Sequence, residues 1–135
     1  MHTSEELKKG EKRVRLTEAA ETLFYQQGVH RTTLADIAQE AEVPLGNVYY
    51  HFRTKEALIE AVIEARLREN RENFATWEQD PDPHHRLLSF IRAERAGAEH
   101  LAAYGCPCGS LSQEMGKSDD QLAQKTAEIF RSQLE

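Results

Sequence analysis

Apolar side chains recur along most of this chain at intervals of three and four residues, the spacing that places them on one face of an α-helix. The first such stripe consists of Leu16, Ala19, Ala20, Leu23 and Phe24. It predicts a helix over residues 11–27, and Gly28 is the kind of residue at which helices end. Since no alternation of β-branched and polar residues persists, the sequence predicts an all-α fold.

Two short helices are predicted directly after the first one. Thr33 and Asp36 have the spacing of a capping box, in which both side chains satisfy amides at the start of a helix that runs to about Ala41. Pro44 then favours the start of a second short helix over residues 45–51, because a proline at the first helical position needs no N–H partner. Two helices joined by so tight a turn are typical of a helix-turn-helix, whose second helix enters the major groove of DNA.

The order of residues in the second short helix predicts one buried side and one exposed side. Val48 and Phe52 are four residues apart and can both face a core. The positions directed largely outward are Leu45, Gly46, Asn47, Tyr50 and His51. Gly46 costs roughly 1 kcal/mol relative to alanine inside a helix, so its presence indicates a reason such as close approach of a ligand to the backbone. DNA is a ligand that fits this pattern.

A long fourth helix is predicted next, and prolines and glycines divide the sequence beyond it. Thr54 is a suitable N-cap for about 25 residues of helix. The stripe of this helix is Ile59, Ile63, Leu67, Asn70, Phe74 and Trp77. Residues 80–83 predict a break and a new helix, and residues 104–116 predict a bend with a short helix. A last helix should begin with a capping box at residues 118–121. Its apolar residues are Leu122, Ile129, Phe130 and Leu134.

Composition and charge limit the class of protein. The 135 residues, 39% apolar and 30% charged, can bury a core, and the net charge of −6 argues against unspecific coating of nucleic acid. The local balance is different, because residues 8–15 hold five basic residues and one acidic residue. Residues 43–55 contain no acidic side chain at all. A polyanion would therefore dock at these two segments.

The sequence also bears on the compartment. It contains no run of about 18 apolar residues, the length that a membrane helix needs, and its first twenty residues lack the apolar core of a signal peptide. The two cysteines are two positions apart, too few and too close for a disulfide framework. We therefore expect a cytoplasmic protein with no membrane partner.

Residues 18–58 resemble the DNA-binding region of TetR/AcrR-type transcriptional repressors. The matching positions are Leu23, Phe24, Gly28, Thr32, Thr33, Asp36, Ile37, Ala38, Gly46, Tyr49, Phe52, Lys55, Glu56, Ala57 and Leu58. The resemblance implies a homodimeric repressor that binds a palindromic double-stranded DNA operator and is released by a small-molecule effector. It also implies a helix-turn-helix domain at residues 1–53 and a helical effector-binding and dimerisation domain at residues 54–135.

The resemblance assigns roles around the second short helix. Phosphate contacts are implied for Thr33, Tyr49, His51 and Lys55. Base contacts are implied for Leu45, Asn47 and Tyr50. The complete set of residues expected at DNA is Thr32, Thr33, Pro44, Leu45, Gly46, Asn47, Tyr49, Tyr50, His51 and Lys55. Two positions depart from the family pattern, since Glu42 stands where a glycine is usual and Pro44 where a serine or threonine is usual.

The second domain resembles the family less specifically. In such repressors the fourth to seventh helices enclose an effector pocket and the last two helices form the dimer interface, which implies that this chain is truncated in its seventh helix. An apolar or aromatic effector is expected. The residues expected to line its pocket are Ile63, Leu67, Phe74, Trp77, Tyr104, Cys106 and Met115. Residues 105–115, GCPCGSLSQEM, resemble a segment that recurs in one AcrR-like branch.

Cys106 and Cys108 leave a second interpretation open, a helical thiol-based redox or metal sensor. Thiols two residues apart on a helix point to different faces. Together with His100 they still supply fewer ligands than a zinc site needs, so inert buried thiols are the simpler interpretation. No combination of nucleophile, base and orienting residue can be assembled, so we expect no enzyme, no catalytic residues, no cofactor and no metal. Two interpretations of the basic residues 8–15 stay open, a disordered arm and an arm that reaches DNA.

Overall fold

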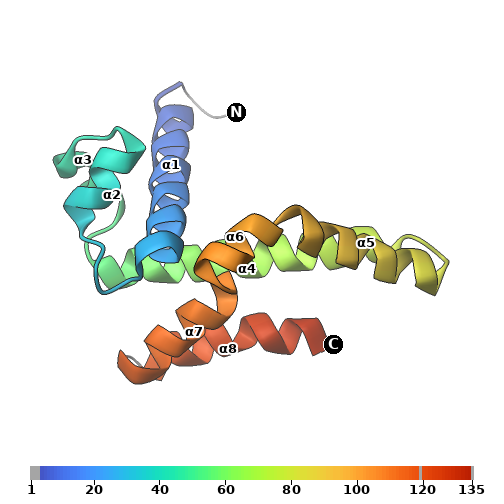
Figure 1. Cartoon of the computed structure of the whole chain (residues 1–135). Helices are drawn as coiled ribbons and strands as arrows, with labels where there is room; N and C mark the ends of the chain where they lie inside the picture. Colours follow the sequence, from blue (N-terminus) through green and yellow to red (C-terminus); the bar gives the residue numbers. More distant parts are fainter. Residues whose placement is uncertain (1–3, 119, 135) are drawn as a thin grey trace. The chain divides into compact units, whose positions relative to one another are not determined.

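A computed structural model describes residues 4–118 and 120–134 of the chain, with side chains given for residues 4–116 and 121–132. Within these residues every regular element is a helix (Figure 1), so the prediction of an all-α fold is confirmed. The helices are α1 (Ser4–Gln27), α2 (Leu34–Ala41), α3 (Leu45–His51), α4 (Lys55–Glu78), α5 (Pro83–Ala96), α6 (Ala98–Tyr104), α7 (Pro107–Ser118) and α8 (Asp120–Leu134). None of them, as far as they are described, is long and apolar enough to cross a bilayer.

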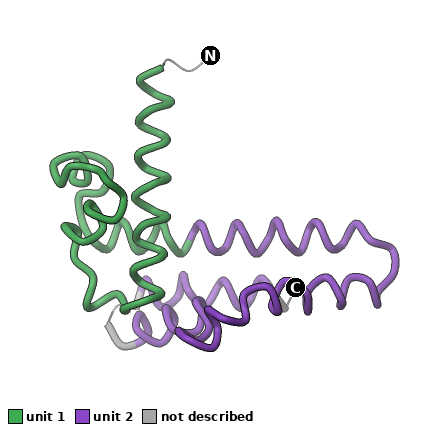
Figure 2. The backbone as a smooth tube through the Cα atoms, turned by 45° about the horizontal axis from the view of Figure 1, so that its top comes forward, with its two compact units in different colours: residues 1–63 green, residues 64–135 purple. Residues whose placement is uncertain are grey.

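The chain forms two compact units, residues 1–63 and residues 64–135, coloured separately in Figure 2. The first unit has a core made of apolar residues from four helices and the loops between them. Its buried apolar residues are Leu16, Ala19, Ala20, Phe24, Val29, Ile37, Ala38, Ala41, Val43, Val48, Phe52, Leu58, Ile59, Val62 and Ile63. Because the first turns of α4 contribute four of them, this unit extends past residue 53, where the sequence placed the domain boundary.

α1 begins at Ser4, whereas the apolar stripe predicts a start near residue 11. Acidic side chains in its first turn stabilise this start, because they lie at the positive end of the helix dipole. Residues 4–15 include no buried side chain, so a pattern of apolar positions could not reveal these turns. The alternative of a disordered arm at the basic residues 8–15 is therefore wrong, and their contact with DNA stays a prediction. The predicted end is confirmed, since Gly28 has φ +88° and its N–H donates to the Phe24 carbonyl at 3.0 Å.

The capping box at the start of α2 is confirmed. The Asp36 N–H donates to the Thr33 Oγ1 at 3.1 Å, and the Thr33 N–H donates to the Asp36 carboxylate at 3.0 Å. These hydrogen bonds, the one from the Thr33 backbone foremost, hold the pKa of Asp36 below its usual value. The box thus sets where the chain enters the two short helices.

The turn between α2 and α3 depends on an unusual backbone conformation. Glu42 directly follows α2 with φ +56° and ψ +44°, the left-handed region that glycine adopts most readily. This conformation lets the N–H groups of Glu42 and Val43 donate to the carbonyls of Gln39 and Ala38, at 3.2 and 2.9 Å. The last carbonyls of α2 are satisfied in this way, at the cost of strain in Glu42.

The predicted bounds of α3 are confirmed, with Pro44 at the N-cap and without a side-chain hydrogen bond there. Thr54 caps α4 as expected, because the Ala57 N–H donates to the Thr54 Oγ1 at 3.1 Å. Asp82 likewise caps α5 and accepts from the His84 N–H at 2.9 Å. The starts of α4 and α5 were predictable from a short polar side chain next to the first turn.

The core of the second unit lies in α7 and α8 rather than in α5. The buried apolar residues there are Leu111, Met115, Leu122 and Ile129. In contrast, Leu87, Leu88, Phe90 and Ile91, the large apolar residues of α5, are all exposed. The second capping box and Leu134 depend on side chains outside the described set.

Replacing Glu42 by glycine should stabilise the first unit. Glycine has no Cβ to strain at φ +56°, so we expect Glu42→Gly to raise the free energy of unfolding by about 1 kcal/mol in urea denaturation. The exposed ion pair of Glu42 with Arg15, at 3.9 Å, contributes little. The matched control is Glu40→Gly, an exposed position within α2, which should lower the free energy of unfolding by about 1 kcal/mol. Equal effects of both variants would contradict the strain at Glu42.

Candidate nucleic-acid interface

α3 is held to the first unit by two apolar side chains and turns its other side outward. Val48 is 0% exposed, and Phe52, which directly follows the helix, is 1% exposed. On the opposite side Leu45, Tyr49 and Tyr50 are 40%, 51% and 65% exposed. So many large exposed side chains on a helix of seven residues are typical of a surface that binds another molecule.

The first turn of α3 leaves its backbone open. A Cβ built on Gly46 would meet no atom of the described chain within 4 Å, so packing inside this unit does not explain the glycine. Pro44 and Gly46 are exposed, and Asn47 is half-buried beside them. A partner molecule can therefore approach the backbone of α3 at this turn.

The threonine pair before α2 divides into a buried and an exposed member. Thr32 is fully buried, and its hydroxyl donates to the Gly28 carbonyl at 2.8 Å and accepts from Gln27 Nε2 at 3.0 Å. A buried hydroxyl with these partners cannot reach a phosphate, so the expected DNA contact of Thr32 is corrected to a structural role. Thr33 is exposed, and its hydroxyl accepts from Asp36 and keeps its own proton available for donation.

Lys55 opens α4 and already has a partner inside the unit. Its Nζ donates to the carbonyl of Val29, in the loop between α1 and α2. An ammonium group has three N–H donors, so this bond leaves two for other acceptors. Lys55 thus ties the start of α4 to the loop that precedes Thr33, and its contact with a phosphate stays a prediction.

Arg13 links α1 to the C-terminal end of α3. Its guanidinium carbon lies 4.3 Å from the centroid of the Phe52 ring, and its Nη1 donates to the His51 carbonyl at 3.2 Å. A cation at this place stabilises the negative end of the helix dipole. The sequence places Arg13 in the basic segment of residues 8–15 and does not predict this contact with α3. Its spacing three residues before Leu16, which begins the buried stripe, could have placed it on the same face of α1.

The imidazole of His51 is half-buried and lies in a positive field. Burial is the largest cause that lowers the pKa of His51, and the charges of Arg13, Lys12 and Lys9 lower this pKa further. The neutral imidazole can still donate one N–H, and an anion beside it would favour the charged form. His51 is therefore suited to a contact whose strength changes with pH.

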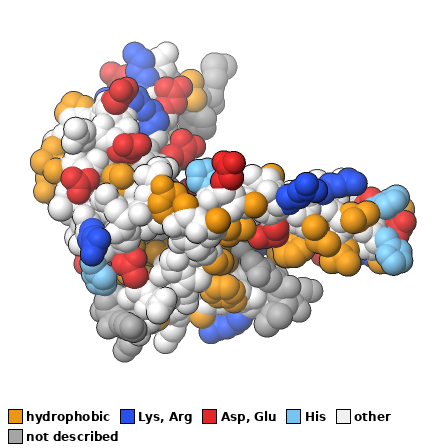
Figure 3. Space-filling view, viewed as in Figure 1, with side chains coloured by type: hydrophobic (Ala, Val, Ile, Leu, Met, Phe, Trp, Pro, Cys, Tyr) orange, Lys and Arg blue, Asp and Glu red, His pale blue; other side chains and the backbone are white. Residues whose placement is uncertain are grey.

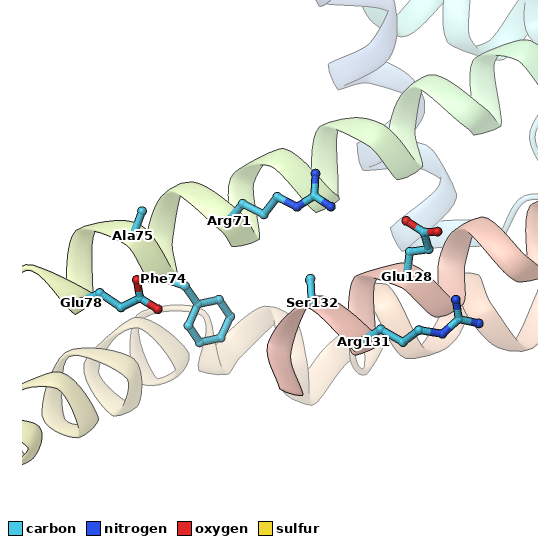
Figure 4. Close-up of a pocket in the computed structure, with 7 residues that line it drawn as sticks. All are labelled: Arg71, Phe74, Ala75, Glu78, Glu128, Arg131 and Ser132. Carbon is cyan, nitrogen blue, oxygen red and sulfur yellow. The ribbon is translucent and has the colours of Figure 1, made fainter. Parts of the chain in front are cut away.

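The second unit contains a groove of about 460 Å³ between α4 and α8, drawn in Figure 4. It is lined by Arg71, Phe74, Ala75, Glu78, Glu128, Arg131 and Ser132. Four of these seven side chains carry a charge, whereas sites for apolar compounds are lined mostly by apolar and aromatic groups. Of the residues predicted to line an effector pocket, Phe74 is the one found here.

The other predicted pocket residues have separate surroundings. Trp77 packs edge to face against Phe74 and Phe90, with ring centroids 5.3 and 5.8 Å apart. Tyr104 is exposed and stacks on His100. Ile63 and Met115 are buried, in the cores of the first and second unit respectively, and Leu67 is half-buried. The structure therefore does not bring these residues together around the groove.

Cys106 and Cys108 are free thiols at the start of α7. Cys106 is exposed, and its Sγ accepts from the Gly109 N–H at 3.3 Å, so the expectation of a buried thiol is wrong for this residue. Cys108 is half-buried, and its burial raises the pKa of the thiol. Among the described residues, no three His, Cys, Asp or Glu side chains form a group that could hold a metal ion.

The role of Thr32 can be tested against a threonine with the same local bond. Thr32→Val should lower the free energy of unfolding by about 1–3 kcal/mol, because Gln27 and the Gly28 carbonyl lose a buried partner. Thr76 also donates to the carbonyl four residues before it, but in an exposed stretch of α4. We expect Thr76→Val to change stability by less than about 0.5 kcal/mol in the same denaturation experiment. Losses of equal size would contradict the buried role of Thr32.

Comparisons with known proteins agree with this arrangement. Residues 16–62 match the family model described as bacterial regulatory proteins, tetR family. The HTH-type transcriptional regulator TtgR of Pseudomonas putida is 43% identical over 72 residues, 53% of this chain and 34% of that protein. The HTH-type transcriptional repressor DhaR of Mycobacterium sp. is 28% identical over 120 residues, 87% of this chain and 59% of that protein. The chain thus spans less than two thirds of the length of these curated relatives.

Solved structures show a similar fold. The regulatory protein TetR from Rhodobacter sphaeroides is 28% identical, with a TM-score of 0.77 over 88% of this chain and 65% of that chain. A TetR-family transcriptional regulator from Agrobacterium tumefaciens is 24% identical, with a TM-score of 0.79 over 92% of this chain and 66% of that chain. All four proteins carry the names of regulators, and none of these names is that of an enzyme.

Proposed function

We propose that the chain is a TetR-type transcriptional repressor that binds double-stranded DNA through α2 and α3, because residues 16–62 match the model of the tetR family of bacterial regulatory proteins. The observation that carries this proposal is the outward side of α3, where large side chains are exposed next to an open backbone at Gly46. A helix presented in this way can enter a major groove about 12 Å wide. Such a regulator acts on DNA in the cytoplasm.

The side chains that we propose to meet DNA fall into two groups by chemistry. Thr33, Tyr49 and His51 are short or rigid donors and bind backbone phosphates, which fixes the position of the protein without reading sequence. Lys55 adds a charged phosphate contact from the start of α4. Leu45, Asn47 and Tyr50 face the bases, where an asparagine side chain can pair with adenine and a leucine can touch a thymine methyl group.

The same proposal includes a homodimer on a palindromic operator. Two copies of α3 reach successive major grooves on one face of the duplex when they are about 34–36 Å apart. A two-fold dimer presents the same surface to both half-sites, so the operator repeats in inverted order.

A small-molecule effector would release the protein from DNA by binding better to the released state than to the DNA-bound state. The groove between α4 and α8 is the candidate site. Two arginines and two glutamates line it, so the structure favours an effector with both acidic and basic groups over the apolar compound expected from the sequence. α4 begins directly after the helix-turn-helix, which gives a bound effector a covalent route to it.

Selection of duplexes from a random pool tests the DNA-binding proposal. We expect one inverted-repeat consensus, bound more tightly than random duplex by several kcal/mol at fixed salt. Asn47→Ala should relax the preference at one symmetric pair of positions, because its side chain reads a base. Asn73→Ala, an exposed asparagine of α4, should return the original consensus. A pool that stays random with the unaltered chain would refute the proposal.

The contact of His51 with DNA should depend on pH. Since the pKa of His51 is lowered in the protein alone, the imidazole is neutral near pH 7, and a phosphate beside it favours the charged form. DNA binding then takes up a proton, so the affinity should rise as the pH falls from about 8 to about 6, the range around the ordinary pKa of histidine. Equilibrium binding at constant ionic strength measures this slope. It should be reduced in His51→Gln and retained in His30→Gln, and a slope unaffected by His51→Gln would remove the phosphate contact.

A further inference from the structure

The first half of α1 extends beyond the core of the first unit and carries a cluster of basic side chains. Burial begins only at Leu16, and no side chain of residues 4–15 is buried. Figure 3 shows Lys and Arg side chains gathered among acidic ones in this upper part of the unit. They are Lys8, Lys9, Lys12, Arg13 and Arg15. Because a helix carries them, the fold determines which of them lie next to α3.

The two arginines of this cluster have partners within the unit. Arg13 is bonded to the His51 carbonyl and lies on the Phe52 ring. Arg15 donates to the Ala41 carbonyl at the end of α2. Both arginines hold α1 against the helix-turn-helix, and we regard them as positioning residues.

Lys9 and Lys12 remain on the face of α1 that Arg13 shares, since positions i, i+3 and i+4 lie together on a helix. The Lys9 Nζ lies 5.3 Å from the centroid of the exposed Tyr50 ring. The charges of Lys9 and Lys12 both reach the His51 imidazole. These two lysines thus lie beside α3 residues that the proposed function places at DNA.

We propose that Lys9 and Lys12 extend the DNA-binding surface from α3 onto α1 and bind backbone phosphates next to the one bound by His51. This inference rests on the proposed function and adds a second binding element to it. Lysine is a compact charge on a flexible stem, which suits a phosphate and does not read a base edge. The two residues therefore add affinity and salt dependence and leave the sequence preference unchanged.

The test compares salt dependence on the selected duplex. Each phosphate contact contributes about 0.9 to the slope of log affinity against log salt, so the double variant Lys9→Gln, Lys12→Gln should lower the slope by about 1.8. A hydroxyl-radical footprint should lose protection at nucleotides that flank each half-site. The matched control is the double variant Arg92→Gln, Arg95→Gln, two exposed basic residues three positions apart on α5, which should keep the slope and the footprint.

The outcomes separate this inference from the proposal beneath it. A double variant with an unchanged slope and footprint overturns the role of α1, while DNA binding by α3 stands if Asn47→Ala still alters the consensus. A slope lowered equally by the Arg92→Gln, Arg95→Gln variant would indicate a general effect of charge and would also overturn the inference. If the unaltered chain selects no DNA sequence, both the proposed function and the role of Lys9 and Lys12 are refuted.

Discussion

The burial of Val48 and Phe52 is the interaction on which the rest of the candidate interface depends. A helix of seven residues is too short to be stable alone, because the cost of its first turn is not recovered over so few hydrogen bonds. These two side chains supply the missing stability from the core. The tyrosines on the opposite side can therefore be exposed in a defined orientation, with the capping box and the Glu42 turn fixing where α3 begins.

The parts of the molecule that follow from local rules were predictable from the sequence. The capping box at Thr33, the bounds of α3 and the burial of Val48 each depend on residues within about one turn of one another. The departure from glycine at Glu42 was also visible, and the structure gives that residue the left-handed conformation. Thr33, Tyr49 and Tyr50 are exposed as a DNA-binding role requires.

The remaining features depend on contacts between distant parts of the chain, which a linear pattern does not contain. The early start of α1 has no apolar signal, so the contact of Arg13 with α3 was not foreseen. Thr32 and Thr33 are adjacent and chemically identical, and only the fold determines that one hydroxyl faces the core. Ile63, Leu67, Phe74 and Trp77 share one helical period, but Phe74 lines the charged groove and Ile63 lies in the core of the first unit.

The residue at which α1 meets the end of α3 is held through its backbone and exchanges a proton through its ring. The guanidinium of Arg13 attaches α1 to the His51 carbonyl, so this attachment does not involve the imidazole. The His51 ring, on the residue whose carbonyl that guanidinium holds, can gain a proton on acidification, and burial holds its pKa below the usual value of histidine. Acidification can thus alter how strongly this corner attracts an anion without loosening the framework that supports it.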